Sequence, residues 1–423
     1  MRPLKLVRGR RQPAPRAHLF WRFVFPAIVV AAGLAVLLLA QEGGRRVLDT
    51  RFETVEERIV LQPDEPGYLE LVGVTPTLLS LHVHNGQLAG LAFMALTGID
   101  AGGGVVLLPA DLQVAPGIGG RQGLVISDVY LRGGAEEVEQ VAEVMFQIGF
   151  DEVVEITTES LAHSMGPAAP LPYLLLDDLL EVGPDGARRV VYEAGGHDLS
   201  SADAAAVYAF RNPGEADVNR VQRQLALWES WLGVIGRADN PDEAAPPPSS
   251  PLSLFMRALG SGTAVVEVPP LHSLVFDPAS PPQYQLTEEP LVDDGRSCDY
   301  GGYESPSWLR DKILELVPRP RQPESFLRPR VKLLDGTGDP ALRDSLIDDV
   351  IAAGGVVTEI GNADEFGIET TLFAYHREEL VNDRSTNCIA IQLGVDMALI
   401  KLGEDTPDVV DITVTVGRDQ ATR

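Results

Sequence analysis

The sequence predicts an α/β protein: one N-terminal transmembrane helix, then a domain with a mixed β-sheet, then a small C-terminal α/β sandwich. Three observations predict this order. Phe23 to Ala40 form an uncharged apolar run of eighteen residues. Residues 68–236 alternate strand-like runs with segments of helical periodicity, and residues 328–423 do so again after a proline-rich stretch. The length of 423 residues, about three typical domains, leaves room for all three parts.

The N-terminal run predicts a signal anchor over residues 19–40. Its length is sufficient to span a bilayer. All seven basic residues of the first forty precede or begin the run, and no acidic residue occurs there. This bias places a basic tail, residues 1–18, in the cytoplasm, and a stalk, residues 41–67, outside. A cleavable signal peptide is the alternative, although Leu38 would then occupy the small-residue position before the cleavage site.

Charge and cysteine content exclude several function classes. The chain has 34 basic and 61 acidic residues, a net charge of −27 that disfavours nucleic acid as a partner. Two cysteines, Cys298 and Cys388, are too few for a disulfide scaffold or a zinc ribbon. They fall in different predicted units, and we therefore expect free or buried thiols.

The first exported domain spans residues 68–317. Two extended segments flank Asn85-Gly86, a strong hairpin motif, and residues 102–114 add a buried strand. Helical spacing follows over residues 135–146, and a short strand over residues 152–159. Two further helices are expected, from Ser200 or Ser201 to Phe210 and over residues 218–235.

A proline-rich part, residues 241–317, ends this domain, and residues 318–327 form a basic linker. The C-terminal domain, residues 328–423, begins with a strand at 331–334 and a helix at 340–353 that ends at Gly354. The remaining elements are two strands, a helix around residues 386–394, and two further strands.

One helical stretch carries the best candidate chemistry. Asp217, Arg220, Arg223 and Gln224 recur at three- and four-residue spacings, so they share a helical face, and Arg211 lies on the preceding loop. Three guanidinium groups beside a carboxylate suit a phosphate or pyrophosphate group. A solvated face with internal ion pairs is the alternative that spacing alone leaves open.

The segment VYAFRNPGEADVNRVQRQ, residues 207–224, resembles the Arg…Asp-x-x-Arg-x-x-Arg-Gln block of the LytR-CpsA-Psr family of bacterial envelope proteins. LLPADLQV resembles the family's Pro-Arg-Asp strand end. VKLLDGTGDPALRDSLIDDVIAAGGVVTEIGNA and DITVTVGRD are similar to the accessory domain that often follows the catalytic one. The resemblance covers residues 68 to about 419.

The resemblance implies a cell-membrane protein with its N-terminus in the cytoplasm and its C-terminal domains outside. It would move a glycopolymer from a polyprenyl-pyrophosphate lipid onto peptidoglycan or another wall polymer. Arg211, Arg220 and Arg223 would be catalytic, Asp217, Gln224 and Arg121 would bind substrate, and Asp111 would hold Mg²⁺.

Two departures from the family pattern put the activity in doubt. Val74 to Thr77 stand where the family's Arg-x-Asp-Thr motif is expected, and Ala110 replaces the arginine of Pro-Arg-Asp. Arg121 either substitutes for a missing arginine or is an exposed loop residue, and Asp111 alternatively caps a turn. A catalytically degenerate binding protein, or a purely structural stalked protein, therefore remains an alternative to the transferase.

His82 and His84 alternate along one predicted strand and so lie on the same side of it. Two histidines in this arrangement occur in metal sites, but no third ligand has a diagnostic spacing. We therefore expect a solvent-facing pair before the turn.

Overall fold

The computed structural model describes residues 61–98, 102–114, 123–274, 283–286, 307–325, 328–377, 380, 384–395, 400–403 and 410–422. The predicted tail, the anchor at 19–40 and most of the stalk lie outside these residues. Within the described part of the chain, no helix is both long enough and apolar enough to cross a membrane.

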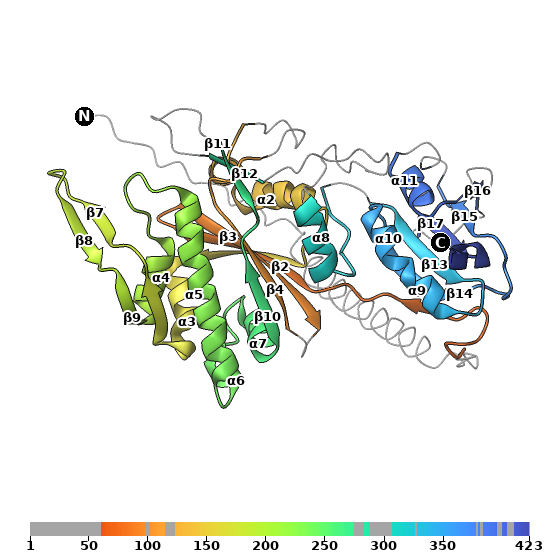
Figure 1. The fold of residues 1–423 in the computed structure, drawn as a ribbon, viewed down its shortest axis with the longest axis horizontal. Coiled ribbons are helices and arrows are strands. Elements are labelled where there is room, and N and C mark those ends of the chain that lie inside the picture. The colour runs from red at the N-terminus through yellow and green to blue at the C-terminus, as the bar shows by residue number, and fades with distance from the viewer. Residues whose placement is uncertain are drawn as a thin grey trace, which may run out of the picture. The chain divides into compact units, whose positions relative to one another are not determined.

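The first domain is built on a five-stranded mixed sheet, as predicted (Figure 1). The strand order is β10-β4-β3-β2-β5. The strands are β2 (Thr77–His84), β3 (Gln87–Gly98), β4 (Gly102–Leu108), β5 (Glu152–Thr157) and β10 (Thr263–Glu267). Strand β3 is antiparallel to both β2 and β4, while β5 is parallel to β2 and β10 is parallel to β4. The carboxyl ends of β2, β4, β5 and β10 therefore lie at one edge.

Helices cover both faces of this sheet, which explains the nearly continuous apolar runs of β2, β3 and β4. Alternate residues of β2 face opposite cores: Leu78 packs in one cluster, Leu79 in the other. The first face carries α3 (Thr158–Met165), α4 (Ser201–Ala209), α5 (Asp217–Arg237) and α7 (Ser253–Ser261). The second carries α2 (Ile126–Phe146) and α8 (Ser307–Leu316).

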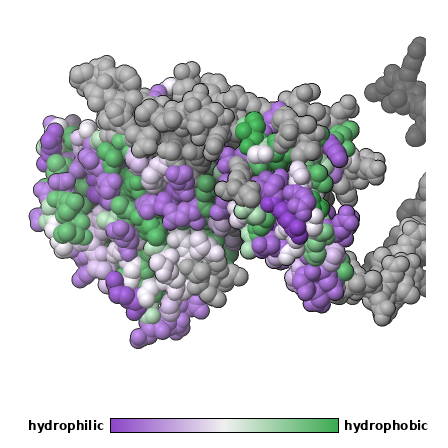
Figure 2. All heavy atoms as spheres, turned by 45° about the vertical axis from the view of Figure 1, so that its right-hand side comes forward, coloured by the Kyte–Doolittle hydropathy of each residue, from purple (hydrophilic) through white to green (hydrophobic). Residues whose placement is uncertain are grey.

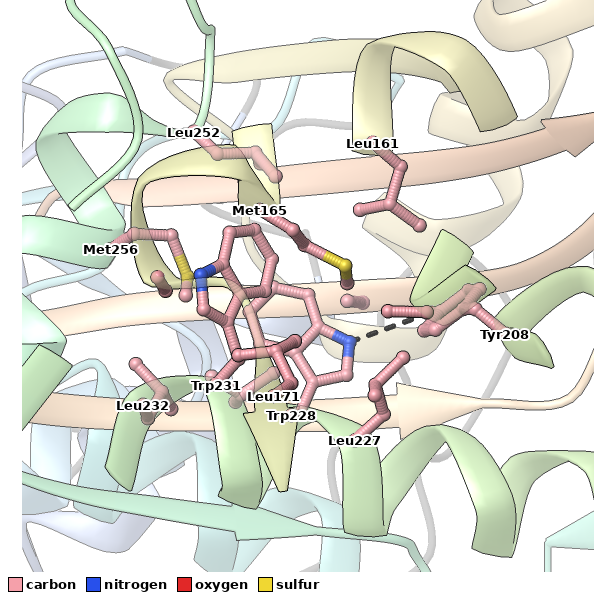
Figure 3. Packing of buried hydrophobic residues seen from close by; sticks show 14 of the residues in the cluster. Leu161, Met165, Leu171, Tyr208, Leu227, Trp228, Trp231, Leu232, Leu252 and Met256 are labelled. Atoms are coloured by element: carbon pink, nitrogen blue, oxygen red, sulfur yellow. Dashed lines mark hydrogen bonds between the residues drawn. The ribbon is translucent and has the colours of Figure 1, made fainter. Parts of the chain in front are cut away.

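Aromatic side chains of α4 and α5 fill the first core (Figure 3). Trp228 and Trp231 are at most 1% exposed, and their ring centroids are 5.5 Å apart. The indole N–H of Trp228 donates to the Tyr208 hydroxyl at 3.5 Å. Burial of such large side chains at helical spacing on α5 fixes this helix against the sheet.

Several short elements lie between or after the main ones. Two antiparallel pairs, β6 (Leu171–Leu175) with β9 (Gly195–Leu199) and β7 (Leu179–Val182) with β8 (Arg188–Tyr192), separate α3 from α4. The others are η1 (Gly166–Ala168), α6 (Pro241–Ala244), β11 (Leu271–Leu274) and β12 (Gln283–Leu286). The sequence predicts no particular strand between residues 160 and 200, so these four strands were not expected.

A six-stranded sheet forms the C-terminal domain, with the order β1-β14-β13-β17-β15-β16. Its strands are β1 (Leu69–Leu71), β13 (Arg330–Asp335), β14 (Val356–Asn362), β15 (Leu372–Tyr375), β16 (Ile400–Leu402) and β17 (Ile412–Val416). Its helices are α9 (Pro340–Ser345), α10 (Ile347–Ala352), α11 (Arg384–Gln392) and η4 (Arg418–Thr422). The helix expected over residues 340–353 is interrupted at Leu346, which ends α9 and precedes α10.

Two findings in this domain differ from expectation. Strand β1 pairs with β14, although residues from 68 onward were expected in the first domain. The β14 residue Asn362 also donates from its side-chain amide to the carbonyls of Pro63 and Glu65. Cys388 on α11 is disulfide-bonded, so the expected free thiol is wrong there. Cys298, the only other cysteine in the sequence, lies outside the described residues.

Hydrophobic and hydrophilic side chains are both exposed on the surface. On the face drawn in Figure 2, hydrophobic residues lie in small groups among hydrophilic ones. Leu131 on α2 and Val182 on β7, 63% and 44% exposed, are exposed apolar residues that also line the pocket described next.

Candidate functional site

A pocket of about 500 Å³ lies at the carboxyl ends of β2 and β4. Ligands of open α/β sheets commonly bind at this edge of the strands. Seven polar residues line the pocket: His84, Gln87, Asp111, Ser127, Glu181, Arg211 and Arg220. The rest of the lining is apolar and includes Leu88, Leu131, Leu180, Val182 and Phe210. The pocket therefore combines an ionic part with a hydrophobic wall.

The first turn of α5 supplies one ion pair of the site. Asp217 is the first residue of the helix, where a carboxylate interacts favourably with the helix dipole. Its Oδ1 is 2.5 Å from Nη2 of Arg220, one turn later, and its Oδ2 accepts the backbone N–H of Asp111 at 3.1 Å. Asp217 is fully buried, whereas Arg220 reaches the pocket lining. The buried carboxylate thus orients the arginine and ties α5 to the end of β4.

The loop before α5 supplies the second ion pair. Arg211 donates from Nη2 to Oδ2 of Asp111 at 2.7 Å and from Nε to the Glu215 carbonyl at 3.1 Å. Burial raises the pKa of Asp111, as does the nearby charge of Asp217, while Arg211 acts in the opposite direction. Arg211 and Asp111 both line the pocket, so this pair faces any ligand.

Arg223 and Gln224 lie behind the pocket rather than in it. Arg223 pairs with Glu215 through both terminal nitrogens, and it donates from Nη2 to the Phe210 carbonyl at 2.7 Å. The buried side-chain amide of Gln224 donates to the carbonyls of Ala89 at 3.0 Å and Tyr208 at 3.2 Å. Both side chains therefore hold the elements that carry the lining residues. Arg121 lies outside the described residues.

Val74 to Thr77, which stand where the family's Arg-x-Asp-Thr motif is expected, lie before or at the start of β2. Thr77 begins this strand, and its N–H donates to Oδ2 of Asp151 at 2.8 Å. An eight-residue strand puts its two ends roughly 23 Å apart. Residues 74–77 therefore do not contribute to the pocket, whereas His84 and Gln87, at the other end, line it.

The two histidines do not form the expected solvent-facing pair. His82 is 2% exposed, lies 2.7 Å from the Ser80 hydroxyl and stacks on Tyr208 with a centroid distance of 4.7 Å. Burial lowers the pKa of His82 to about 3. The pairing of β2 with β3 shifts its register between His82 and Val83. Beyond this shift, His84 is exposed and lines the pocket. The expectation is wrong for His82, because helices cover the face of the sheet on which it lies.

The carboxylates of the site do not make a resident Mg²⁺ site. Magnesium needs several oxygen ligands in octahedral geometry. Asp111 and Asp217 are each engaged by an arginine. In the part of the chain that the structure describes, no group of three or more His, Cys, Asp or Glu residues is arranged to hold a metal.

No protein-family model and no curated protein matches the sequence. The structure is similar over about half its length to solved LytR-CpsA-Psr family proteins. TagV of B. subtilis is similar over 50% of this chain and 91% of its own, with 16% identity and a TM-score of 0.39. TagT bound to LIIa-WTA is similar over 56% of this chain and 91% of its own, with 17% identity and a TM-score of 0.40.

The family protein YwtF (TagT) with bound octaprenyl pyrophosphate lipid is similar over 56% of this chain and 91% of its own, with 17% identity and a TM-score of 0.38. TM-scores below 0.5 at this identity assign neither a ligand nor an activity to the present chain.

Proposed function

We propose that the protein binds a polyprenyl-pyrophosphate-linked glycopolymer in the bacterial envelope and presents it to a wall acceptor. The observation that carries this proposal is the composition of the pocket. Arg211, Arg220 and the first turn of α5 line or border one part of it, and apolar side chains line the rest. An anion joined to an apolar chain matches both parts.

The ionic part favours pyrophosphate over a single negative charge. Guanidinium groups bind phosphate oxygens through two parallel hydrogen bonds, and two of them are present. Arg211 is the more exposed of the two arginines, because its side chain is 34% exposed against 7% for Arg220. Burial and the charge of Asp217 raise the pKa of Asp111, and a pyrophosphate carries more negative charge than one carboxylate. A pyrophosphate can therefore take the place of Asp111 on Arg211.

Transfer is the reaction that such binding would serve. An acceptor hydroxyl oxygen would bond to the phosphorus next to the sugar, the phosphoanhydride bond would break, and polyprenyl phosphate would leave. Asp111, released from Arg211, would take the hydroxyl proton. Only two arginines face the pocket among the described residues, and Asp111 and Asp217 balance their charge. We therefore propose that transfer is slow, and that the binding function dominates.

An extracytoplasmic location fits this proposal. The sequence predicts the anchor at residues 19–40 with the acidic remainder of the chain outside. The disulfide at Cys388 supports the same location, because stable disulfides form mainly in oxidising compartments.

Farnesyl pyrophosphate tests the proposal with the full chain in detergent micelles. We expect it to bind more tightly than farnesol, and we expect Arg211→Gln to weaken binding about tenfold or more, as loss of a charge-assisted hydrogen bond predicts. Arg211→Gln is the cleaner variant, since Arg220→Gln would leave Asp217 buried without its arginine. Inorganic pyrophosphate separates the contribution of the headgroup from that of the chain.

Arg189→Gln on the exposed β8 strand is the matched control, because it removes one arginine outside the pocket lining. It should leave affinity unchanged. Equal affinity for farnesol and farnesyl pyrophosphate, or equal loss in both variants, would refute a pyrophosphate site at Arg211.

A further inference from the structure

His84 is held at the rim of the pocket from two sides. It ends β2, is exposed and lines the pocket. Its Nδ1 is 2.9 Å from the Thr158 hydroxyl, and its Nε2 is 2.9 Å from the side-chain nitrogen of Asn85. Asn85 and Gly86 have φ values of 50° and 76°, as in a tight hairpin turn of type I′. The ring therefore has a defined position facing the ligand space.

The positively and negatively charged groups that line the pocket beside His84 are equal in number, and two further carboxylates lie nearby. Two arginines, Arg211 and Arg220, and two acidic residues, Asp111 and Glu181, line the pocket. Its cross-strand neighbour Gln87 is uncharged. Asp217 lies behind the lining, paired with Arg220, and Glu159 on α3 interacts electrostatically with His84. A proton on His84 would therefore give the residues of the lining itself, without these two neighbouring carboxylates, an excess of one positive charge.

Resting on the pyrophosphate-binding function proposed above, we infer that His84 is a third, proton-dependent ligand for the pyrophosphate group. A proton at Nε2 turns this atom from a hydrogen-bond acceptor into a donor. The Asn85 amide then turns its oxygen toward the ring or gives way to a phosphate oxygen, while Nδ1–H donates to the Thr158 hydroxyl. Histidine is the side chain that ordinarily gains its charge between pH 8 and pH 5.

This inference predicts that the contribution of His84 to affinity grows as the pH falls. Pyrophosphate also changes its protonation in this range, but it does so equally for every protein variant. The ratio of the dissociation constants of His84→Gln and wild type therefore isolates the histidine. We expect this ratio to rise from about 1 at pH 8 to about 10 at pH 5.5, the effect of one charge-assisted contact.

The experiment measures both ligands with the full chain in micelles, by calorimetry at the two pH values. Inorganic pyrophosphate and farnesyl pyrophosphate should give the same ratio, because the contact is with the headgroup. His197→Gln on β9 is the matched control, because His197 is partly exposed and lies outside the pocket lining. Its ratio should stay near 1. Nuclear magnetic resonance adds a second readout: bound pyrophosphate should change the chemical shifts of the His84 ring more at pH 5.5 than at pH 8.

A ratio that stays constant with pH, while wild type binds both ligands, overturns the role of His84 and leaves the proposed function intact. Failure of wild type to bind either ligand overturns both. A ratio that differs between the two ligands would place His84 against the lipid chain and not against the pyrophosphate, and so would also refute the inference.

Discussion

His82 shows how burial changes the role of a residue that the sequence makes conspicuous. Alternation along β2 places it opposite Leu81, but helices cover both faces of the sheet, so neither face is solvent-exposed. Its ring lies against Tyr208 and edge-on to Trp228, and its Nδ1 has no hydrogen-bond partner in the structure. His82 thus belongs to the aromatic core, whereas His84, two residues later, belongs to the pocket.

The stability of the protein should depend on pH through His82. Its pKa is about 3 in the folded chain because of burial, against an ordinary value of 6.5. Below pH 6.5 the unfolded state therefore binds a proton that the folded state does not, and stability falls with pH down to about pH 3. Relative to a variant without the His82 imidazole, the unfolding free energy of wild type should fall by about 2 kcal/mol between pH 7.5 and pH 5.

Urea unfolding of wild type and His82→Gln at these two pH values checks this prediction. Carboxylates contribute equally to both proteins, so the difference between their unfolding free energies reports His82 alone. His197→Gln, at a partly exposed position, should show the same pH dependence as wild type. If the difference in unfolding free energy between wild type and His82→Gln does not change with pH, the His82 ring is charged or solvated in the folded state.

At the scale of elements, the loop between α4 and α5 is fixed on three sides. Arg223 of α5 holds Glu215 and the Phe210 carbonyl. The Asn212 side chain accepts the Leu180 N–H of β7 at 2.6 Å, and Arg211 pairs with Asp111 after β4. The position of Arg211 is therefore set by contacts with several elements.

Glu215→Gln separates positioning from direct electrostatics. If Glu215 acted only through its charge, removing it near an anion site would tighten pyrophosphate binding. We expect the reverse, a severalfold loss of affinity. The ion pair of Arg223 with residue 215 would be weaker, so the loop backbone that positions Arg211 would be held less firmly. Binding and thermal unfolding should be measured together, with Glu193→Gln, an exposed residue beyond β8, as control. Tighter binding by Glu215→Gln would contradict the positioning role.

The sequence predicted helices and strands correctly where the hydrophobic periodicity is strong and where tertiary contacts do not determine the local structure. The Asn85-Gly86 hairpin and the helix at 218–235 are both present, as β2–β3 and α5. Strands β6 to β9 were missed, because short pairs such as Leu179–Val182 with Arg188–Tyr192 have neither length nor clear alternation. Arg211, Arg220 and Asp111, which their motif singled out, line the pocket, whereas the positions of Arg223 and Gln224 behind it depend on tertiary partners.

At the scale of the whole molecule, the chain before the first sheet follows a path that differs from the one expected. Residues 61–72 lie along β14 of the C-terminal sheet, and they reach β2 only afterwards. The Gly67 N–H donates to the Ala363 carbonyl at 3.0 Å, and the Val72 N–H donates to the Thr358 carbonyl at 3.0 Å. Sequence alone gave no indication of this pairing, since a three-residue strand such as LEL has no measurable period.

This path makes the C-terminal domain a two-segment structure, which can be tested with a fragment and a peptide. Residues 328–423 contain the central strands β13 and β17, with Val331, Leu333 and Val414 fully buried, so we expect the fragment to unfold cooperatively. The fragment lacks β1, which pairs with β14 in the full chain. A synthetic peptide of residues 61–73 should bind it and raise its melting temperature by several degrees, as mass action requires.

Cys388→Ser should be used in the fragment, because Cys388 is disulfide-bonded in the full chain and the fragment omits Cys298. Loss of a disulfide costs about 2–5 kcal/mol, so the peptide effect must be compared within this one background. A peptide with Val72→Asp is the matched control, because Val72 packs against the core of this domain and an aspartate would be buried there. Amide resonances of residues 358–363 should shift with the natural peptide and not with the control. Equal shifts with both peptides, or no shift with either, would mean that β1 is not a specific part of this sheet.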